Sequence, residues 1–479
     1  MSWLCSLWIV ACSVLSSMAT KEPVGIYSEG QIILGGLFPV RDKGLDHTCG
    51  TINKQRGIQR LEAMRYAVRD INNNPKILGN ITLGVKIFDT CSDATHALDQ
   101  SLDFVMSTLE VAQPALCPGE MTTEDKQPDL VMAIIGAAYS SVSIQVANLL
   151  RLFKIPQISY ASTSAELSQK DRYGYFMRTV PPDKLQAKAL VDIVYRFNWT
   201  YVTTVASEGE YGDSGIAAFK KMFEERAGHC IAAAERISRA ATAFDFISLV
   251  RRLRIQKAKV VILFVREDDA EGILRAAQTE QYINDFIWIA SDGWGNGQKP
   301  VAGNEQAAAG SLTITLQSQY MKEFDDYFLS LTPENNKENI WFQEYWEDIF
   351  GCRWQDGISV NESLNDSITY LPVTHTEHTF KRRICSENET DVNYRQEAKI
   401  QFVYDAVYAV ALGLDRVYKE ICGPDAQGFC DELRTNDSLR TILRDYIKEN
   451  DQNGEYLVLL HVSASNTKPC GLVCWSGRS

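Results

Sequence analysis

The 479-residue sequence lacks long apolar runs and an excess of positive charge. Beyond its N-terminal segment, nothing approaches the roughly 18 consecutive apolar residues of a membrane-spanning helix, and Val260–Val265 has the length of a buried strand. The 61 acidic residues outnumber the 48 basic ones, giving a net charge of −13. This charge argues against nucleic acid or an anionic membrane surface as a partner. A small anionic ligand is still compatible with it, because a few local cations decide such binding.

The sequence also lacks a strong signature of catalysis or metal binding. Gly212–Gly215 resembles a serine-protease nucleophile segment, but it lies among alternating strands and helices with no histidine placed to serve it. Gly293–Gly297 is rich in glycine without the dinucleotide-binding spacing. His375 and His378 lie in an expected loop without a cysteine cluster, which favours solvated side chains over a metal site. We therefore expect no enzyme activity, no metal and no cofactor.

The N-terminus has the pattern of a secretory signal peptide, expected over residues 1–20. Trp3–Val14 is mostly apolar and Ser16–Thr20 supplies small residues for cleavage, although the segment has no Lys or Arg. A membrane anchor is the alternative, but the apolar run is too short to span a bilayer. The twelve cysteines agree with an oxidising, extracellular compartment. Six Asn-x-Ser/Thr glycosylation motifs point the same way: Asn80, Asn198, Asn361, Asn365, Asn388 and Asn436.

Strands and helices alternate in two series, one over residues 31–200 and one from Trp199 onward. Repeated strand–helix units imply parallel sheets with right-handed crossovers. Two series imply an α/β protein of two lobes, with a cleft between the strand ends. We expect residues 331–395 to be a surface insertion and the Ser/Gly-rich residues from about Ala464 to be a loose tail.

Hydroxyl side chains follow two neighbouring strands of the first series. Ser140 follows the apolar run Val131–Gly136, and the turn 161–166 follows Pro156–Tyr160. Thr163 and Glu166 have capping-box spacing, so we expect a second helix to begin there. Two helix N-termini at one sheet edge would favour a small anion such as a carboxylate. The alternative for each turn is an ordinary N-cap without a ligand.

Other residues near the expected cleft suit the remaining groups of an amino acid. Asp183, Tyr211 and Asp292 fall in turns or at a strand end, where carboxylates and an aromatic ring could hold an ammonium group. Arg56 and Arg60, in the turn into the first helix, could hold a distal carboxylate. Solvated loop arginines are the alternative for this pair.

Several blocks closely resemble the extracellular ligand-binding domain of metabotropic glutamate receptors, from about Glu29 to about Arg444. The turn at 161–164 and Arg56 look most like the group II members. The resemblance implies a bilobal, periplasmic-binding-protein-like (venus-flytrap) fold of two doubly wound, mainly parallel sheets joined by a hinge. The blocks that carry it are Arg56–Met64, Val142–Ser164, Arg178–Asp183, Phe197–Val202 and Ala290–Gly295.

The resemblance also implies lobe boundaries and binding roles. Lobe 1 is expected over 29–184 and 320–440, lobe 2 over 185–319 and 441–463, and a divergent tail over 464–479. Ser140, Ala161 and Thr163 match the residues that hold the α-carboxylate. Asp183, Tyr211 and Asp292 match those around the ammonium group. Arg56, Arg60 and Lys399 match the cations of the side-chain carboxylate, which favours L-glutamate.

Covalent and dimer contacts follow from the same resemblance. It implies the disulfides Cys49–Cys91, Cys352–Cys385 and Cys422–Cys430. Cys117 matches a cysteine that links two protomers, and the apolar dimer face matches Leu98, Leu149, Leu152 and Phe153, for which ordinary helix core is the alternative. Cys230 matches a cysteine that pairs with a cysteine-rich domain absent from this sequence, so we expect it to be free or paired with Cys470 or Cys474.

The resulting hypothesis is an extracellular L-glutamate-binding domain of a class C G-protein-coupled receptor, in a truncated, secreted form. It would be at the plasma membrane if the natural product is full length. It would form a homodimer or pair with the full-length receptor. The alternative is a secreted dimerisation fragment or decoy that binds no ligand. We expect Arg60→Ala to weaken glutamate binding strongly and to spare folding.

Overall fold

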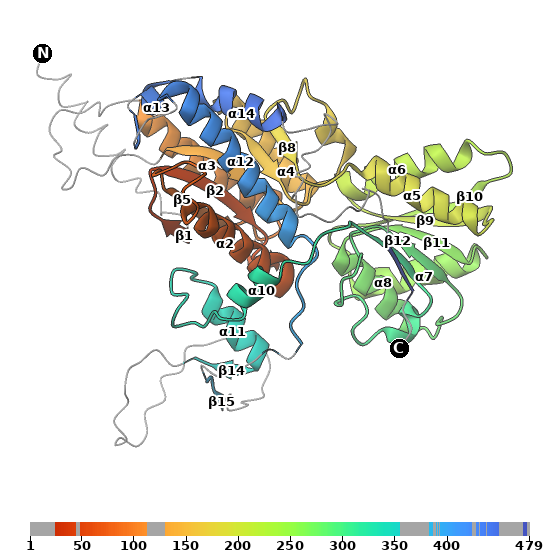
Figure 1. Cartoon of the computed structure of the whole chain (residues 1–479). Coiled ribbons are helices and arrows are strands. Elements are labelled where there is room, and N and C mark those ends of the chain that lie inside the picture. The colour runs from red at the N-terminus through yellow and green to blue at the C-terminus, as the bar shows by residue number, and fades with distance from the viewer. Residues whose placement is uncertain are drawn as a thin grey trace, which may run out of the picture.

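Two six-stranded sheets organise the chain. The structure is a computed structural model that describes residues 24–44, 48–112, 130–354, most of 383–449, and 473–476. Each sheet is parallel except for one antiparallel edge strand. In Figure 1 the red-to-orange N-terminal elements and the blue C-terminal helices form lobe 1, and the yellow-green and green elements form lobe 2. The expected bilobal α/β fold is confirmed.

The sheet of lobe 1 buries both of its faces. Ile32 and Leu34 of β2 point into one core cluster, whereas Ile33 and Leu37 point into the other, as the alternation of side chains along a strand requires. Helices α2 and α12 pack on the first face and α3 and α4 on the second. The strands, in spatial order, are β1 (Gly25–Ser28), β5 (Leu83–Asp89), β2 (Ile32–Phe38), β6 (Val131–Ile135), β7 (Gln157–Ser159) and β8 (Phe176–Arg178).

The helices of lobe 1 come from both halves of the sequence. The stripe Leu61, Met64 and Val68 of α2 is buried, and each such side chain contributes about 1.5–3 kcal/mol. The segment that leads into α2 is a short π-helical turn, η1 (Lys54–Gln59). The helices are α2 (Arg60–Asn72), α3 (Ala94–Ala112), α4 (Ser140–Leu150), α10 (Lys322–Phe328), α11 (Phe342–Phe350), α12 (Ile400–Ile421), α13 (Glu432–Thr435) and α14 (Leu439–Glu449).

Lobe 2 repeats this layered arrangement. Val261 and Leu263 of its central strand face the helices α7 and α8, and Val260 and Ile262 face α5 and α6. The strands, in spatial order, are β10 (Cys230–Ile237), β9 (Tyr201–Ser207), β11 (Val260–Phe264), β12 (Ile287–Ala290), β13 (Leu312–Thr315) and β16 (Val473–Ser476). The helices are α5 (Asp183–Arg196), α6 (Glu210–Glu224), α7 (Ala243–Ile255), α8 (Glu267–Thr279) and α9 (Glu305–Ala308).

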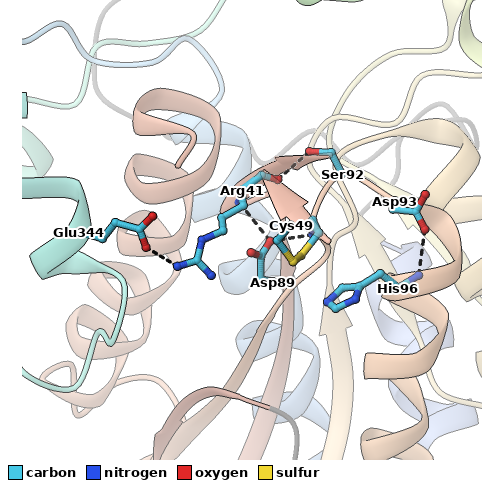
Figure 2. Close-up of a disulfide and its surroundings, with 8 residues drawn as sticks. Arg41, Cys49, Asp89, Ser92, Asp93, His96 and Glu344 are labelled. Carbon is cyan, nitrogen blue, oxygen red and sulfur yellow. Dashed lines mark hydrogen bonds and ion pairs between the residues drawn. A yellow bond between two sulfur atoms is a disulfide. The ribbon is translucent and has the colours of Figure 1, made fainter. Parts of the chain in front are cut away.

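All three expected disulfides are present. Cys49–Cys91 joins the hairpin of β3 (Arg41–Lys43) and β4 (Cys49–Ile52) to the end of β5. Figure 2 shows this disulfide beside Asp89, whose Oδ1 accepts hydrogen bonds from the backbone N–H groups of Cys91 (2.8 Å) and Arg41 (3.2 Å). Cys352–Cys385 joins β14 (Cys352–Arg353) to the residue that follows β15 (Arg383–Ile384), and Cys422–Cys430 follows α12.

The C-terminal boundaries differ from those we expected. Residues 441–463 were assigned to lobe 2, but Leu443 and Ile447 of α14 pack against α12 in the core of lobe 1. Within the expected loose tail, Val473–Ser476 forms β16, an antiparallel edge strand beside β13. The apolar positions of α14 could have indicated that this helix packs in a core. Within the described ranges, no helix is both long and apolar enough to cross a membrane.

Candidate functional site

The two hydroxyl-bearing turns meet at the carboxyl end of the lobe 1 sheet. Ser140 begins α4, and its Oγ accepts a hydrogen bond of 3.2 Å from the backbone N–H of Ser164. Thr163 is buried in the turn that also contains Ser164. Ser143 and Ser162 join the turns again through hydroxyls 2.7 Å apart. The structure therefore brings Ser140 and Thr163 together, as expected.

The second turn does not begin a helix at Thr163, so the expected capping box is wrong. Only a 3-10 turn follows, η3 (Ala165–Ser168), in which Ser164 accepts the N–H of Glu166 at 3.2 Å. The Glu166 carboxylate instead accepts from the Tyr173 hydroxyl at 2.6 Å and pairs with Arg172 at 3.0 Å. This edge of the sheet thus offers one helix N-terminus, that of α4, together with backbone N–H groups and hydroxyls.

Arg178 fixes the shape of this turn, a role that the sequence analysis missed. Its guanidinium is buried and donates to the backbone oxygen of Ser164 at 2.9 Å and to the Ser168 hydroxyl at 2.5 Å. The signal was a charged residue at the end of a buried strand, because a buried charge is seldom left without structural partners.

Asp183 lies where the chain passes from lobe 1 to lobe 2. Its backbone N–H donates to the oxygen of Thr163 at 2.8 Å, while the rest of α5 packs in lobe 2. Its side chain is fully buried, and among the described residues its Oδ2 has no hydrogen-bond partner. Burial raises the pKa of Asp183 to about 8, an effect that the Thr163 hydroxyl and nearby cations offset only in part. Asp183 therefore places a buried carboxyl group with one unpaired oxygen between the two lobes.

Tyr211 and Asp292 meet across the top of the lobe 2 sheet. The Tyr211 hydroxyl lies 2.8 Å from Asp292 Oδ1 and 2.7 Å from the Ser291 hydroxyl. Lys399, from lobe 1, binds the other Asp292 oxygen at 2.7 Å. Burial alone would raise the pKa of Asp292, but the Lys399 ammonium and the Tyr211 hydroxyl hold it below its ordinary value. Asp292 is thus an ionised acceptor shared by both lobes.

Arg56 and Arg60 lie on successive turns of the same helical segment and find carboxylates far away in the sequence. Arg56 crosses to lobe 2, where its Nε binds Glu267 at 2.8 Å and its Nη2 donates to the oxygen of Gly293 at 2.9 Å. Arg60 is buried and donates two hydrogen bonds, of 2.9 and 2.6 Å, to the carboxylate of Glu397. Neither glutamate was singled out in the sequence analysis, because no local spacing connects them to the arginines.

Eight expected residues therefore belong to one connected set at the facing strand ends. Ala161, the ninth, is buried in the turn beside Thr163. The links run from Ser140 through the 161–164 turn to Asp183, and from there through the side-chain amide of Gln186 to Asp292. Asp292 is linked in turn through Lys399 and Glu397 to Arg60, and Arg56 contacts the neighbouring Gly293. The eight are Arg56, Arg60, Ser140, Thr163, Asp183, Tyr211, Asp292 and Lys399. The arrangement offers hydroxyls and N–H groups at one end, carboxylates in the middle and cations at the other.

The remaining expected residues fall partly inside the described chain. Leu152 is 68% exposed, whereas Leu98, Leu149 and Phe153 are half-buried on or beside α3 and α4. Cys230 is exposed and forms no disulfide with a described residue. Asn80 and Asn198 are exposed and Asn436 is half-buried. Outside the described residues lie Cys117, Asn361, Asn365, His375, His378, Asn388, Cys470 and the signal segment.

One group of described residues has side chains close enough to share an ion: Cys49, Cys91 and His96. Figure 2 shows the two sulfur atoms joined to each other beside the imidazole. Bonded sulfurs are not thiolates, which are the form in which cysteine binds metals. The group is therefore a disulfide with a neighbouring histidine, and it lies among β3, β4 and β5.

Comparison with known proteins gives a family. Residues 59–453 match the family described as "Receptor family ligand binding region". Metabotropic glutamate receptor 8 of Mus musculus and that of Homo sapiens are each 45% identical over 429 residues, which is 89% of this chain and 45% of the relative. The chain thus spans about half the length of these relatives, and its subgroup stays a prediction. The chain belongs to the receptor ligand-binding-region family, and over most of its length it is similar to part of these metabotropic glutamate receptors.

Proposed function

We propose that the cleft binds L-glutamate and that binding holds the two lobes closed. The observation that carries this proposal is the order of chemical groups along the connected set. Hydroxyls and a helix N-terminus suit an α-carboxylate, the ionised Asp292 and the carboxyl oxygens of Asp183 suit an ammonium group, and three cations suit a second carboxylate. The names of the relatives, which are glutamate receptors, support the same ligand.

We expect the lobes to close on the ligand because the proposed binding residues are divided between the two lobes. Ser140, Thr163 and the distal cations belong to lobe 1, whereas Tyr211 and Asp292 belong to lobe 2. A ligand that contacts both sets stabilises the arrangement in which they face each other, which is a hinge closure. In a class C G-protein-coupled receptor this closure would be the signal passed to the membrane region.

Ligand-dependent thermal stabilisation of the secreted chain tests the proposal. A ligand that binds only the folded state stabilises it by about 2.7 kcal/mol at 100 times its Kd. We expect L-glutamate to raise the melting temperature more than any other of the twenty amino acids. A flat response to all of them would favour the alternative, a secreted dimerisation fragment or decoy that binds no ligand.

We also propose that the chain dimerises through α3 and α4, which pack side by side. This surface carries apolar side chains that are open to solvent, with Leu102 47%, Met106 55% and Leu152 68% exposed. Contact with a second copy would remove these side chains from water. Sedimentation of the secreted chain is expected to give a dimer, and Leu152→Glu a monomer; equal behaviour of the two proteins would exclude this surface.

A further inference from the structure

Each of the three cations proposed to hold the distal carboxylate already has a carboxylate partner within the chain. Arg56 pairs with Glu267 at 2.8 Å and Lys399 with Asp292 at 2.7 Å, and both pairs cross from lobe 1 to lobe 2. Arg60 pairs with Glu397 inside lobe 1. Three positive and three negative side chains leave this end of the cleft with no net charge.

The Arg60–Glu397 pair differs from the other two in geometry and in burial. It is a bidentate fork with bonds of 2.9 and 2.6 Å, and the two side chains are only 3% and 10% exposed. Glu397 accepts a further hydrogen bond of 2.8 Å from the backbone N–H of Lys399. Charge-assisted forks of this type are the stronger class of protein hydrogen bonds.

The placement of the partners decides which of them an incoming ligand meets. Opening the cleft separates Arg56 from Glu267 and Lys399 from Asp292, because the members of these pairs lie on different lobes. Glu397 stays beside Arg60 in either state, since both lie on lobe 1 at the N-terminal ends of α12 and α2. A ligand carboxylate therefore enters a cluster in which one cation is permanently paired.

We propose that Glu397 is a specificity-determining residue that limits how strongly the site favours a second carboxylate over an uncharged group. This inference rests on the proposed function. Glu397 acts as a built-in competitor: it satisfies two donors of Arg60 and repels a ligand anion placed beside it. Removing its charge leaves Arg60 as a buried cation without a counter-ion, and the ligand carboxylate then supplies one.

The test compares Glu397→Gln with the wild-type chain in calorimetric titrations with L-glutamate and L-glutamine. Couplings between two binding groups are typically 5- to 150-fold, and we expect about a tenfold gain for glutamate with less than about a twofold change for glutamine. The matched control is Glu280→Gln, because Glu280 forms the same fork with Arg251 (2.7 and 2.9 Å) on the surface of lobe 2. Its affinities are expected to equal those of the wild type.

Two results separate the inference from the proposed function. Wild-type binding of glutamate with equal or weaker binding by Glu397→Gln would overturn the inference alone. No binding by either protein would overturn the proposed function and the inference together. Glu397→Asp retains the charge on a shorter side chain, so it is expected to fold and to keep the wild-type glutamate-to-glutamine ratio within about threefold. A tenfold rise of that ratio in Glu397→Asp would show that charge is not the cause.

Discussion

The two ends of the proposed binding site differ in where their polar groups find partners. At the hydroxyl end, Ser140 and Thr163 are neutral and sit in turns that lobe 1 completes by itself. At the cationic end, Arg56 and Lys399 find their carboxylates on the opposite lobe. Neutral polar groups are satisfied by local hydrogen bonds, whereas buried charges need partners of opposite sign. The hydroxyl end is thus preformed, and the cationic end is assembled when the lobes meet.

The largest effect is expected from Arg60→Ala, at the cationic end. The change removes a distal cation and leaves Glu397 buried without a partner, which costs about 3–5 kcal/mol of stability. Glutamate affinity should fall at least about thirtyfold, since truncating one member of a buried charge pair costs about 2–5 kcal/mol. Denaturant unfolding and calorimetry measure the two losses. The buried pair is the reason that we now predict a loss of stability as well, where the sequence alone led us to expect that folding is spared.

A double variant isolates the cause of that instability. Arg60→Ala with Glu397→Ala removes both charges and should recover most of the stability but not the affinity for glutamate. Arg251→Ala, in the surface fork of the same geometry, serves as the control and should leave both properties unchanged. Equal stability of the single and double variants would show that Glu397 carries no buried charge that needs Arg60.

Asp183, between the two ends, predicts a pH dependence of stability. Its pKa of about 8 in the folded chain exceeds the value of about 3.9 expected when unfolded, so the folded state binds more protons between those values. The contribution of Asp183 to the free energy of unfolding is therefore full below about pH 4 and falls until about pH 8. Asp183→Asn should remove this decline in denaturant unfolding across that range. Asp192→Asn, an exposed carboxylate on the same helix, should retain it.

At the hydroxyl end, Thr163→Val should weaken glutamate by about tenfold. The change deletes one hydrogen bond to the α-carboxylate, worth about 1.5 kcal/mol when the acceptor is charged. It should weaken glutamine equally, because both ligands share that group. The control is Thr204→Val, a buried threonine of β9 whose hydroxyl has no partner among the described residues. A glutamate-selective loss would place Thr163 at the wrong end of the ligand.

The smallest effect is expected from Glu267→Gln, which weakens one contact between the lobes. Arg56 keeps its bond to the oxygen of Gly293, so glutamate affinity should change little. The ligand-free chain should nevertheless open more often, since one of the cross-lobe ion pairs is lost. Small-angle scattering should show a larger radius of gyration without ligand and the wild-type value with it. An unchanged ligand-free radius would mean that this pair does not hold the lobes together.

The sequence predicts the fold well because its signals are local. Apolar periodicity marks α2 and α12, and the short apolar runs mark the central strands of both sheets. The turn after Tyr160 was misjudged, because capping-box spacing does not show that Ser164 competes with Thr163 for the cap. The β16 edge strand was missed because its pairing with β13 joins distant segments.

In the candidate site, too, some residues could be found from local sequence and others could not. Hydroxyls after two strands could be found from local spacing, and they proved to be neighbours. Lys399 was found through the family resemblance alone, because it lies on a distant helix. Glu397 was not singled out as the partner of Arg60, since 337 residues separate the two in sequence. Long-range ion pairs of this kind depend on the folded arrangement and leave no periodic signal.

The measurement that tests the central claim most directly is a calorimetric comparison of L-glutamate with L-glutamine on the secreted wild-type chain. These ligands share the groups proposed to bind the hydroxyl end and differ only in the charge that meets the cations. The account predicts saturable binding of glutamate at one site per chain, with glutamine weaker by at least about tenfold. Absence of heat with glutamate, or equal affinity for the two ligands, would contradict it.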